Sequence, residues 1–369
     1  MQKNANSEDP TKAVLSKSKL HKKHLCDYVL NIGTGCRHGC VFCYVPGTPN
    51  ISMRQKMLKE EAGVEDAQKE WGQYVLYRSH IPSVLPGKVD RKRKWKHTDK
   101  GLGVVGISFH TDAYMDQRAA NLATQAVRIL SDREKYVRVL TRSPLNAATH
   151  PIRRDPSGKV TVRGKDALSN AGEYLTVGAS INSLDNNEVT AIERNAPPVS
   201  ARLRGLKKLN EEGIQTFVSM SPTYPTQDKQ DIRNLMEKLA ELDPGVIFHE
   251  PINPRGDNFE LTVAAAEEAG EIELARSLTE IQSGPAWKDY ALKHFKWVQE
   301  LGEEMDLPVH LWPDKDLVGL CSGREKEWLQ AWRDRQSPEE FAGRDTPNEP
   351  MPDIPPSSTQ QTLNSSSRG

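Results

Sequence analysis

The chain has 369 residues, and its 50 lysines and arginines balance its 50 aspartates and glutamates, so its formal net charge is zero. This length allows one large domain or two ordinary ones, and the balanced charge singles out no class of partner. No apolar run approaches the roughly 20 residues that a membrane span requires, so we expect no membrane association.

The N-terminal residues 1–24 are polar and rich in lysine, serine and asparagine, with no apolar periodicity. Such a segment buries too little apolar surface to offset the entropy lost on ordering, which predicts a disordered tail. It also contains no apolar stretch typical of a signal peptide, so we expect a cytoplasmic protein whose cysteines stay reduced.

A short apolar strand is predicted over residues 27–33, and it leads directly into a cluster of cysteines. Cys36, Cys40 and Cys43 have the spacing C-x3-C-x2-C, although the whole chain contains only five cysteines. Three thiolates on one loop can bind three irons of a [4Fe–4S] cluster, which normally takes four cysteine ligands. Such a loop would leave one iron open to another molecule, as in catalytic metal sites.

A structural zinc site is the alternative interpretation of these cysteines. Cys36 and His38 could join the Cys40–Cys43 pair to complete four ligands, which would make the chain a non-catalytic metal-binding module. No second C-x2-C pair or H-x3-5-H pattern follows, so this alternative is less favoured. Cys26 and Cys321 are too isolated to bind a second cluster.

A basic segment follows at about residues 80–101, around Trp95. Lysine and arginine neutralise phosphates and an indole can stack on a base, so this segment is a candidate contact for nucleic acid. A solvated surface loop is the alternative, since most runs of charge have no partner. The basic residues concerned are Lys88, Arg91, Lys92, Arg93 and Lys94.

Apolar strands then alternate with amphipathic helices, which indicates parallel βα units. Six such units predict an α/β fold with a partial (β/α)6 barrel of the TIM type, in which chemistry gathers at the C-terminal ends of the strands. The further strands are predicted at residues 103–109, 136–141, 174–181, 214–220 and 245–249, and the helices at 117–130, 187–194, 199–212 and 229–242.

The chain divides by composition into a barrel and flanking segments. We expect the barrel over residues 25–257, a mostly helical C-terminal extension over 258–335, and a disordered tail over 336–369 that is rich in proline, serine and glutamine. A surface hairpin or loop is expected near residues 152–172 because that stretch contains a Pro-Ser-Gly turn.

The stretch from Asp27 to Tyr44 resembles the opening of the radical S-adenosylmethionine (SAM) proteins, and in particular the spore photoproduct lyase-like group. Shorter matches follow at the later strand ends, and the resemblance runs from about residue 25 to 260. These matches are Thr111-Asp112-Ala-Tyr114, Thr141-Arg142-Ser143, Ser180-Ile-Asn182 and Glu193-Arg194-Asn195.

This resemblance implies an enzyme that holds a [4Fe–4S] cluster through Cys36, Cys40 and Cys43. The cluster would cleave SAM reductively and generate a 5′-deoxyadenosyl radical that acts on a substrate. A reductase, or an electron donor of the ferredoxin or flavodoxin type, is implied as a partner.

The resemblance also implies contacts to SAM from the ends of the strands. Tyr44, or its neighbour Phe42, would lie near the adenine, and Thr111 and Asp112 near the methionyl ammonium. The remaining candidates would bind the methionyl carboxylate or the ribose hydroxyls: Arg142, Arg194, Ser180 and Asn182.

The substrate is not identified by the resemblance. Spore photoproduct lyases carry a catalytic cysteine soon after the second strand, whereas residues 106–117 of this chain contain none. Nucleic acid, a peptide and a small molecule therefore all stay open as substrates. His249 and Glu250 are candidate substrate contacts because they end a barrel strand, and Cys321 is a candidate hydrogen-atom donor.

Overall fold

The computed structural model describes residues 7–23, 25–92, 94–95, 103–254, 256–338 and 349–356. Within these residues the largest sheet has eight strands in the order β13-β12-β11-β10-β7-β6-β3-β2. Its neighbouring strands are parallel, except that β2 runs antiparallel to β3. The strands are β2 (Ser16–Lys17), β3 (Tyr28–Leu30), β6 (Val105–Ile107), β7 (Val137–Thr141), β10 (Leu175–Ser180), β11 (Gln215–Thr223), β12 (Ile247–Pro251) and β13 (Val309–Leu311).

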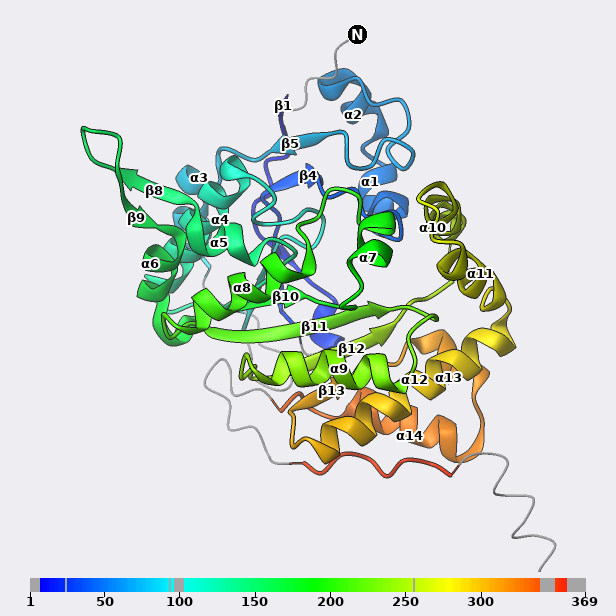
Figure 1. Cartoon of the computed structure of the whole chain (residues 1–369). Helices are drawn as coiled ribbons and strands as arrows, with labels where there is room; N and C mark the ends of the chain where they lie inside the picture. The colour runs from blue at the N-terminus through cyan, green and yellow to red at the C-terminus, as the bar shows by residue number, and fades with distance from the viewer. Residues whose placement is uncertain are drawn as a thin grey trace, which may run out of the picture.

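Helices pack against the outer face of this sheet and alternate with its strands (Figure 1). Side-chain caps set the starts of some of them: Asp116 accepts a hydrogen bond from the backbone of Ala119, and Asp228 accepts one from Gln230. The alternation confirms the predicted α/β partial barrel. The helices between β6 and β12 include α4 (Gln117–Ser131), α5 (Pro144–Thr149), α7 (Asn186–Ile192), α8 (Val199–Asn210) and α9 (Lys229–Ala240).

A second, smaller sheet lies beside the start of the barrel and has the order β1-β5-β4. Strand β4 (Gly33–Gly35) leads straight into the cysteines, while β1 (Ser7–Glu8) and β5 (Val75–Tyr77) come from before and after them. A local apolar core around Tyr74 and Leu76 supports this sheet. It includes residues of η2 (Val45–Gly47), α1 (Pro49–Ser52) and α2 (Gln55–Ala62).

Residues 7–23 are ordered, contrary to the expectation from their composition. Asp9 is buried, and its Oδ2 accepts hydrogen bonds from Thr34 Oγ1 at 2.7 Å and Arg78 Nε at 2.9 Å. Burial alone would raise the pKa of the Asp9 carboxyl, but Arg78 and the hydroxyls of Thr11 and Thr34 hold it below its usual range. This buried charge pair, together with the buried side chain of Val14, fixes the segment. Residues 1–6 and 24 lie outside the described part.

The basic segment begins as a helix, α3 (Ile81–Asp90), that packs against α4. Trp95 then donates from Nε1 to the carbonyl oxygen of Gly103 at 2.7 Å, and its ring lies 4.5 Å from that of Tyr28. Tyr28 begins β3 and Gly103 precedes β6, so Trp95 packs near the N-terminal ends of these strands, away from the cysteines. Arg93 and residues 96–102 lie outside the described residues.

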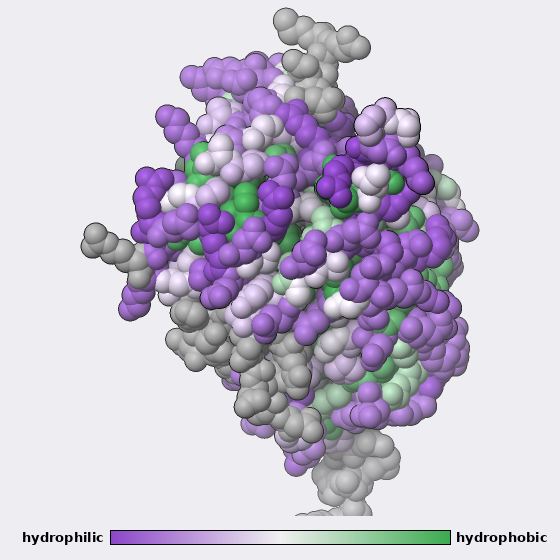
Figure 2. Space-filling view, turned by 90° about the vertical axis from the view of Figure 1, so that its left-hand side faces the viewer, coloured by the Kyte–Doolittle hydropathy of each residue, from purple (hydrophilic) through white to green (hydrophobic). Residues whose placement is uncertain are grey.

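The predicted surface hairpin is present as β8 (Pro151–Arg154) and β9 (Val160–Arg163), which project from the barrel (Figure 1). It is followed by α6 (Gly164–Leu168) and η3 (Ser169–Tyr174). Figure 2 shows the face that lies on the left-hand side of Figure 1. This face is mainly hydrophilic, with apolar residues in small separate areas. Across the described residues, no helix combines the length and apolar character needed to cross a bilayer.

The C-terminal extension is mainly helical, as predicted, but it also completes the barrel sheet. Strand β13 pairs in parallel with β12, and one apolar core runs from Ala179 to Trp332. The boundary predicted after residue 257 therefore does not separate two cores. The helices are α10 (Asp257–Glu268), α11 (Ile272–Glu280), α12 (Gly284–Glu304), α13 (Lys315–Leu320) and α14 (Gly323–Asp334).

Part of the predicted C-terminal tail is also placed against the extension. The side-chain amide of Gln299 donates to the carbonyl oxygen of Pro352 at 2.6 Å, and Arg335 donates to that of Glu349 at 2.7 Å. Residues 349–356 therefore contact α12 and the end of α14. Residues 339–348 and 357–369 lie outside the described part.

The Asp9 network predicts a measurable loss of stability. Asp9→Asn removes the charge that faces buried Arg78, and breaking a buried ion pair costs about 3–5 kcal/mol. We expect a decrease of that order in the free energy of unfolding, measured with urea. The control Glu65→Gln removes an exposed partner of Lys59 and should cost less than about 1 kcal/mol. Equal stability of the two variants would contradict the role of Asp9.

Candidate metal and cofactor site

A cavity of about 590 Å³ reaches from the cysteine loop into the barrel. Its upper wall consists of the cysteine loop and of residues at the C-terminal ends of the parallel strands. This is the end of a βα barrel where binding sites form. The residues on this wall include Cys36, Cys40, Phe42, Cys43, Tyr44, Thr111, Asp112, Arg142, Ser180, Ser221 and Glu250.

The three cysteines of the motif all line this cavity. Cys36 and Cys40 are buried and Cys43 is half-buried. Burial raises the pKa of the Cys36 thiol to about 12, and it raises that of Cys40 well above its usual value although Arg142 opposes the shift. Among the described residues, no three His, Cys, Asp or Glu side chains converge closely enough for a single metal ion. Three cysteine thiolates that line one cavity are a donor set suited to three irons of a multi-iron cluster.

The path of the loop depends on two glycines and on the segment after α7. Gly35 has φ +95°, and a Cβ there would lie 2.4 Å from the carbonyl oxygen of Tyr74. Gly39 has φ +60°, which also favours glycine. Downstream, Asn195 binds the loop twice: its backbone N–H donates to the His38 carbonyl at 3.0 Å and its side chain to that of Arg37 at 3.1 Å.

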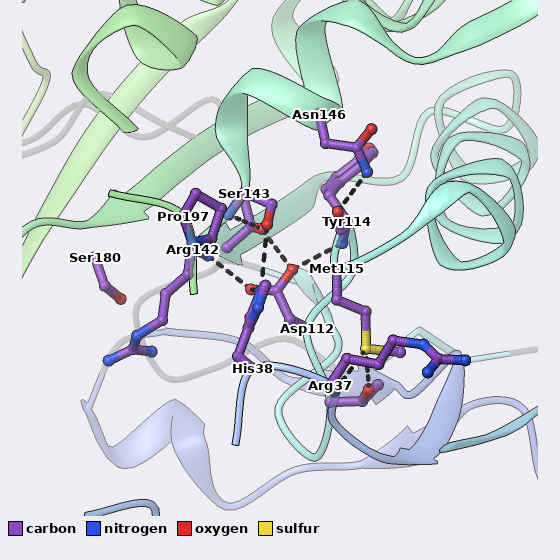
Figure 3. Close-up of polar contacts among 12 residues, drawn as sticks. Arg37, His38, Asp112, Tyr114, Met115, Arg142, Ser143, Asn146, Ser180 and Pro197 are labelled. Carbon is purple, nitrogen blue, oxygen red and sulfur yellow. Dashed lines mark hydrogen bonds and ion pairs between the residues drawn. The ribbon is translucent and has the colours of Figure 1, made fainter. Parts of the chain in front are cut away.

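Asp112 connects the loop to strands β6 and β7 (Figure 3). Its Oδ1 accepts from Thr141 Oγ1 at 2.6 Å and from the backbone of Tyr114 at 2.8 Å. Its Oδ2 accepts from the backbone of Arg142 at 2.7 Å and lies 3.4 Å from His38 Nε2. A carboxylate has about four acceptor positions, and all four are used here. Asp112 also lines the cavity, and its predicted contact with the methionyl ammonium stays a prediction.

The loop residues Arg37 and His38 are also held by protein groups. His38 Nε2 lies 3.2 Å from Ser143 Oγ as well as facing Asp112, and its Nδ1 lies 3.4 Å from the carbonyl oxygen of Asn195. Arg37 pairs with Asp116 at 2.9 Å. Since both ring nitrogens of His38 face protein atoms, the histidine needed for a four-ligand zinc site is already engaged.

Arg142 reaches the cavity from the end of β7 and is held there by a buried carboxylate. Glu193 Oε2 accepts from Arg142 Nε at 2.9 Å and from Arg202 Nη2 at 2.5 Å. Burial alone would raise the pKa of Glu193, but the two arginines lower it to about 2. Two guanidinium groups share one carboxylate, so positive charge remains on the cavity side. In Figure 3 the Arg142 side chain extends toward Ser180.

Six of the residues predicted to contact SAM or substrate line the cavity together with the cysteines. They are Tyr44, Thr111, Asp112, Arg142, Ser180 and Glu250, and Phe42 joins them with its ring 5.3 Å from the Arg142 guanidinium carbon. Their proximity agrees with the predicted roles, which stay predictions.

Two of the predicted SAM contacts lie elsewhere. Asn182 is fully buried behind the cavity wall, where its amide donates to the Pro222 carbonyl at 2.9 Å and to the Tyr224 hydroxyl at 2.6 Å. Arg194 lies on the outer surface and pairs with Glu268 at 3.6 Å. Both residues follow β10 in the sequence, but neither side chain lines the cavity.

The remaining candidates, His249 and Cys321, are core residues. His249 is buried on the side of β12 that faces α12, where its Nε2 lies 3.0 Å from Thr223 Oγ1. Cys321 is buried at the end of α13 within the core of the extension. Neither side chain lines the cavity, so the predicted substrate contact and hydrogen donation are not supported.

Several cavity residues were missed from the sequence. They alternate along the strands, as Arg138 and Leu140 do on β7, and as Phe217 and Ser219 do on β11. Side chains two residues apart share a face of a strand, so this alternation was a usable signal. Trp312, from beyond the predicted barrel, had no such signal.

Comparisons with known proteins agree with this geometry. The family model described as the radical SAM superfamily matches residues 30–239, which is more than half of the chain. This chain belongs to the radical SAM superfamily. Membership makes it an enzyme of the radical SAM class, which overturns the alternative of a non-catalytic zinc module. The cofactors of the superfamily are a [4Fe–4S] cluster and SAM.

Individual relatives extend the match along the chain. Uncharacterized protein ORF301 of Acidianus two-tailed virus is 29% identical over 272 residues, which covers 70% of this chain and 80% of that protein. Uncharacterized protein MJ0683 of Methanocaldococcus jannaschii is 24% identical over 222 residues, which covers 60% of this chain and 68% of that protein. The solved structure of a spore photoproduct lyase variant matches with a TM-score of 0.55 and 13% identity. The match covers 83% of this chain and 80% of that protein. That likeness shows a shared fold.

The Glu193 pair predicts how stability depends on pH. The folded-state pKa is lowered from 4.5 to about 2, so the stabilisation is fully present above about pH 4.5 and is lost as the pH falls toward 2. Glu193→Gln should therefore be most destabilising at neutral pH, and the gap from the unsubstituted protein should narrow below about pH 4.5. Urea unfolding at a series of pH values measures this gap. Glu268→Gln, at the exposed pair with Arg194, should cost little at any pH; a Glu193→Gln gap that stays constant with pH would contradict the assignment.

Proposed function

We propose that this radical SAM protein binds one [4Fe–4S] cluster through Cys36, Cys40 and Cys43. With the cluster and SAM bound, the site would supply reductive cleavage of SAM to methionine and a 5′-deoxyadenosyl radical that abstracts hydrogen from a substrate. The observation that carries this proposal is the meeting of three cysteine side chains with Arg142 around one cavity at the ends of the barrel strands.

The protein's own contribution is to position SAM and to shield the reacting atoms from water. Arg142 is the candidate partner of the methionyl carboxylate, because Glu193 orients its guanidinium toward the cavity. The hydroxyls of Thr111 and Ser180 are candidate hydrogen-bonding partners beside it. The rings of Phe42 and Tyr44 supply apolar surface next to the last cysteine, where an adenine can pack.

Asp112 and His38 have a positioning role in this proposal. They connect the cysteine loop to the ends of β6 and β7, so the thiols and Arg142 keep a fixed relation. Preorganisation of this kind lowers the cost of aligning a cofactor with its substrate.

A role for nucleic acid through Lys88, Arg91, Lys92, Arg93 and Lys94 stays a prediction. Trp95, the aromatic residue of this segment, already packs on Tyr28 near the N-terminal ends of the strands. Nucleic acid bound there would not reach the cysteine side of the cavity directly. This placement favours a substrate that enters the cavity itself.

The ligand assignment is tested by cysteine substitution. Cys36→Ala, Cys40→Ala and Cys43→Ala should each lose most of the iron bound after anaerobic reconstitution, together with the 5′-deoxyadenosine formed from SAM and dithionite. Cys321→Ala is the matched control, because that buried thiol lies outside the cavity, and it should retain both. Iron content and chromatography provide the measurements. Retention of iron and turnover in the three motif variants would show that the ligands are wrong.

The carboxylate contact is tested by comparing two arginines. Arg142→Gln removes a charged donor, and a hydrogen bond to a charged group contributes about 1.5–3 kcal/mol, so SAM should bind roughly 10- to 100-fold more weakly. Arg194→Gln, at the outer surface, should leave SAM affinity unchanged. Calorimetric titration of SAM into reconstituted, oxidised protein measures both affinities. A larger loss for Arg194→Gln would reverse the assignment.

A further inference from the structure

The cavity continues past the cysteine side into the interior of the barrel. We call this inner part the barrel chamber. Leu20 and Leu25 lie at its far end, near the N-terminal ends of the strands, and Arg138 is buried beside them with Nη1 donating to the Leu25 carbonyl at 3.3 Å. The residues of the chamber wall are Phe109, Arg138, Leu140, Phe217, Phe248 and Trp312.

Two glycines allow aromatic rings to lie flat against the strands. A Cβ at Gly106 would come within 2.2 Å of the Phe109 ring, and one at Gly178 within 2.3 Å of the Phe217 ring. Such distances are far inside van der Waals contact, so any side chain at these positions would push the rings into the chamber. The glycines therefore keep the chamber open and its wall aromatic.

The rings form a continuous wall from β11 to β13. Phe217 meets Phe248 edge-on at 5.7 Å, and Phe248 stacks on Trp312 at 4.4 Å with an interplanar angle of 22°. The Arg138 guanidinium carbon lies 5.5 Å from the Phe217 ring and 5.8 Å from the Phe248 ring. This geometry is suited to a flat ring, because aromatic groups pack in offset-stacked or edge-to-face arrangements.

Polar groups lie above this wall, toward the cavity rim. Ser219 and Ser221 continue the inward face of β11, and Glu250 continues that of β12. They present hydroxyl and carboxylate oxygens to whatever occupies the chamber. A ligand there therefore meets an aromatic wall on one side and hydrogen-bonding groups at its edge.

We propose that the barrel chamber binds a planar aromatic ring system of the substrate, with its polar edge toward Ser219, Ser221 and Glu250. This inference rests on the proposed function, and it deepens that function by naming the substrate's chemical class. The cavity volume of about 590 Å³ is in the range of small-molecule sites and is shared with SAM, so one ring system enters rather than an extended duplex. The C-terminal extension supplies Trp312, so it takes part in substrate selection.

The chamber is distinct from the expected SAM contacts. Tyr44, Thr111, Arg142 and Ser180 lie with the cysteines at the upper end of the cavity, whereas Leu25 and Arg138 lie at the opposite end of the same space. An aromatic ligand in the chamber should therefore bind together with SAM and should not compete with it.

Equilibrium binding of small probes tests the chamber. Thymine, indole and cyclohexanol are each titrated into reconstituted, oxidised full-length protein, with and without saturating SAM, and followed by saturation-transfer NMR. We expect at least one of the two planar aromatic probes to bind, cyclohexanol not to bind, and SAM not to displace the bound probe. Preference for thymine would identify a nucleobase, and preference for indole an aromatic amino-acid side chain.

Substitutions locate the bound probe. Trp312→Leu and Phe248→Leu should each weaken aromatic binding about tenfold, the usual effect of losing a stacking partner. Trp297→Leu is the matched control, because that indole lies on α12 and does not line the cavity. Absence of aromatic binding, displacement by SAM, or equal weakening by Trp312→Leu and Trp297→Leu would each overturn the proposal.

This test is separate from that of the proposed function. The chamber wall contains none of the three motif cysteines, so probe binding should persist in protein without a cluster. Formation of 5′-deoxyadenosine by the unsubstituted protein tests the cofactor chemistry by itself. Loss of one result with retention of the other shows which proposal has failed.

Discussion

The buried carboxylate of Asp112 is the contact on which the geometry of the site depends. Its two oxygens receive groups from the cysteine loop, from the turn after β6 and from the end of β7, segments that are far apart in sequence. A buried charge is tolerated only when its hydrogen-bonding capacity is met, so these segments hold one another in place. Displacing any of them would leave an uncompensated charge inside the protein.

Glu193 has a similar function on the other side of the cavity. It joins Arg142, which reaches the cavity, to Arg202, a buried residue of helix α8. Asn195, two residues later, binds the backbone of the cysteine loop. The segment after α7 therefore positions both Arg142 and the cysteine loop through one short stretch of chain.

The C-terminal extension contributes to the barrel in a way that its helical composition conceals. Strand β13 has only three residues, but it adds a seventh parallel strand and brings Trp312 onto the Phe248 ring. At the other end of the chain, Asp9 supports the small sheet that leads into the cysteines. Segments outside the predicted barrel thus complete the cavity wall and support the cysteine loop.

Local pattern determined the strands and helices of the barrel and the identity of the cysteine loop, because hydrophobic period and cysteine spacing are properties of neighbouring residues. The family resemblance singled out Thr111, Arg142 and Ser180, which line the cavity. It could not decide that Asp112 is saturated by internal donors, that Asn182 and Arg194 turn away from the cavity, or that residues 7–23 are ordered. Those outcomes depend on which distant groups meet a side chain in space, and only the tertiary structure sets them.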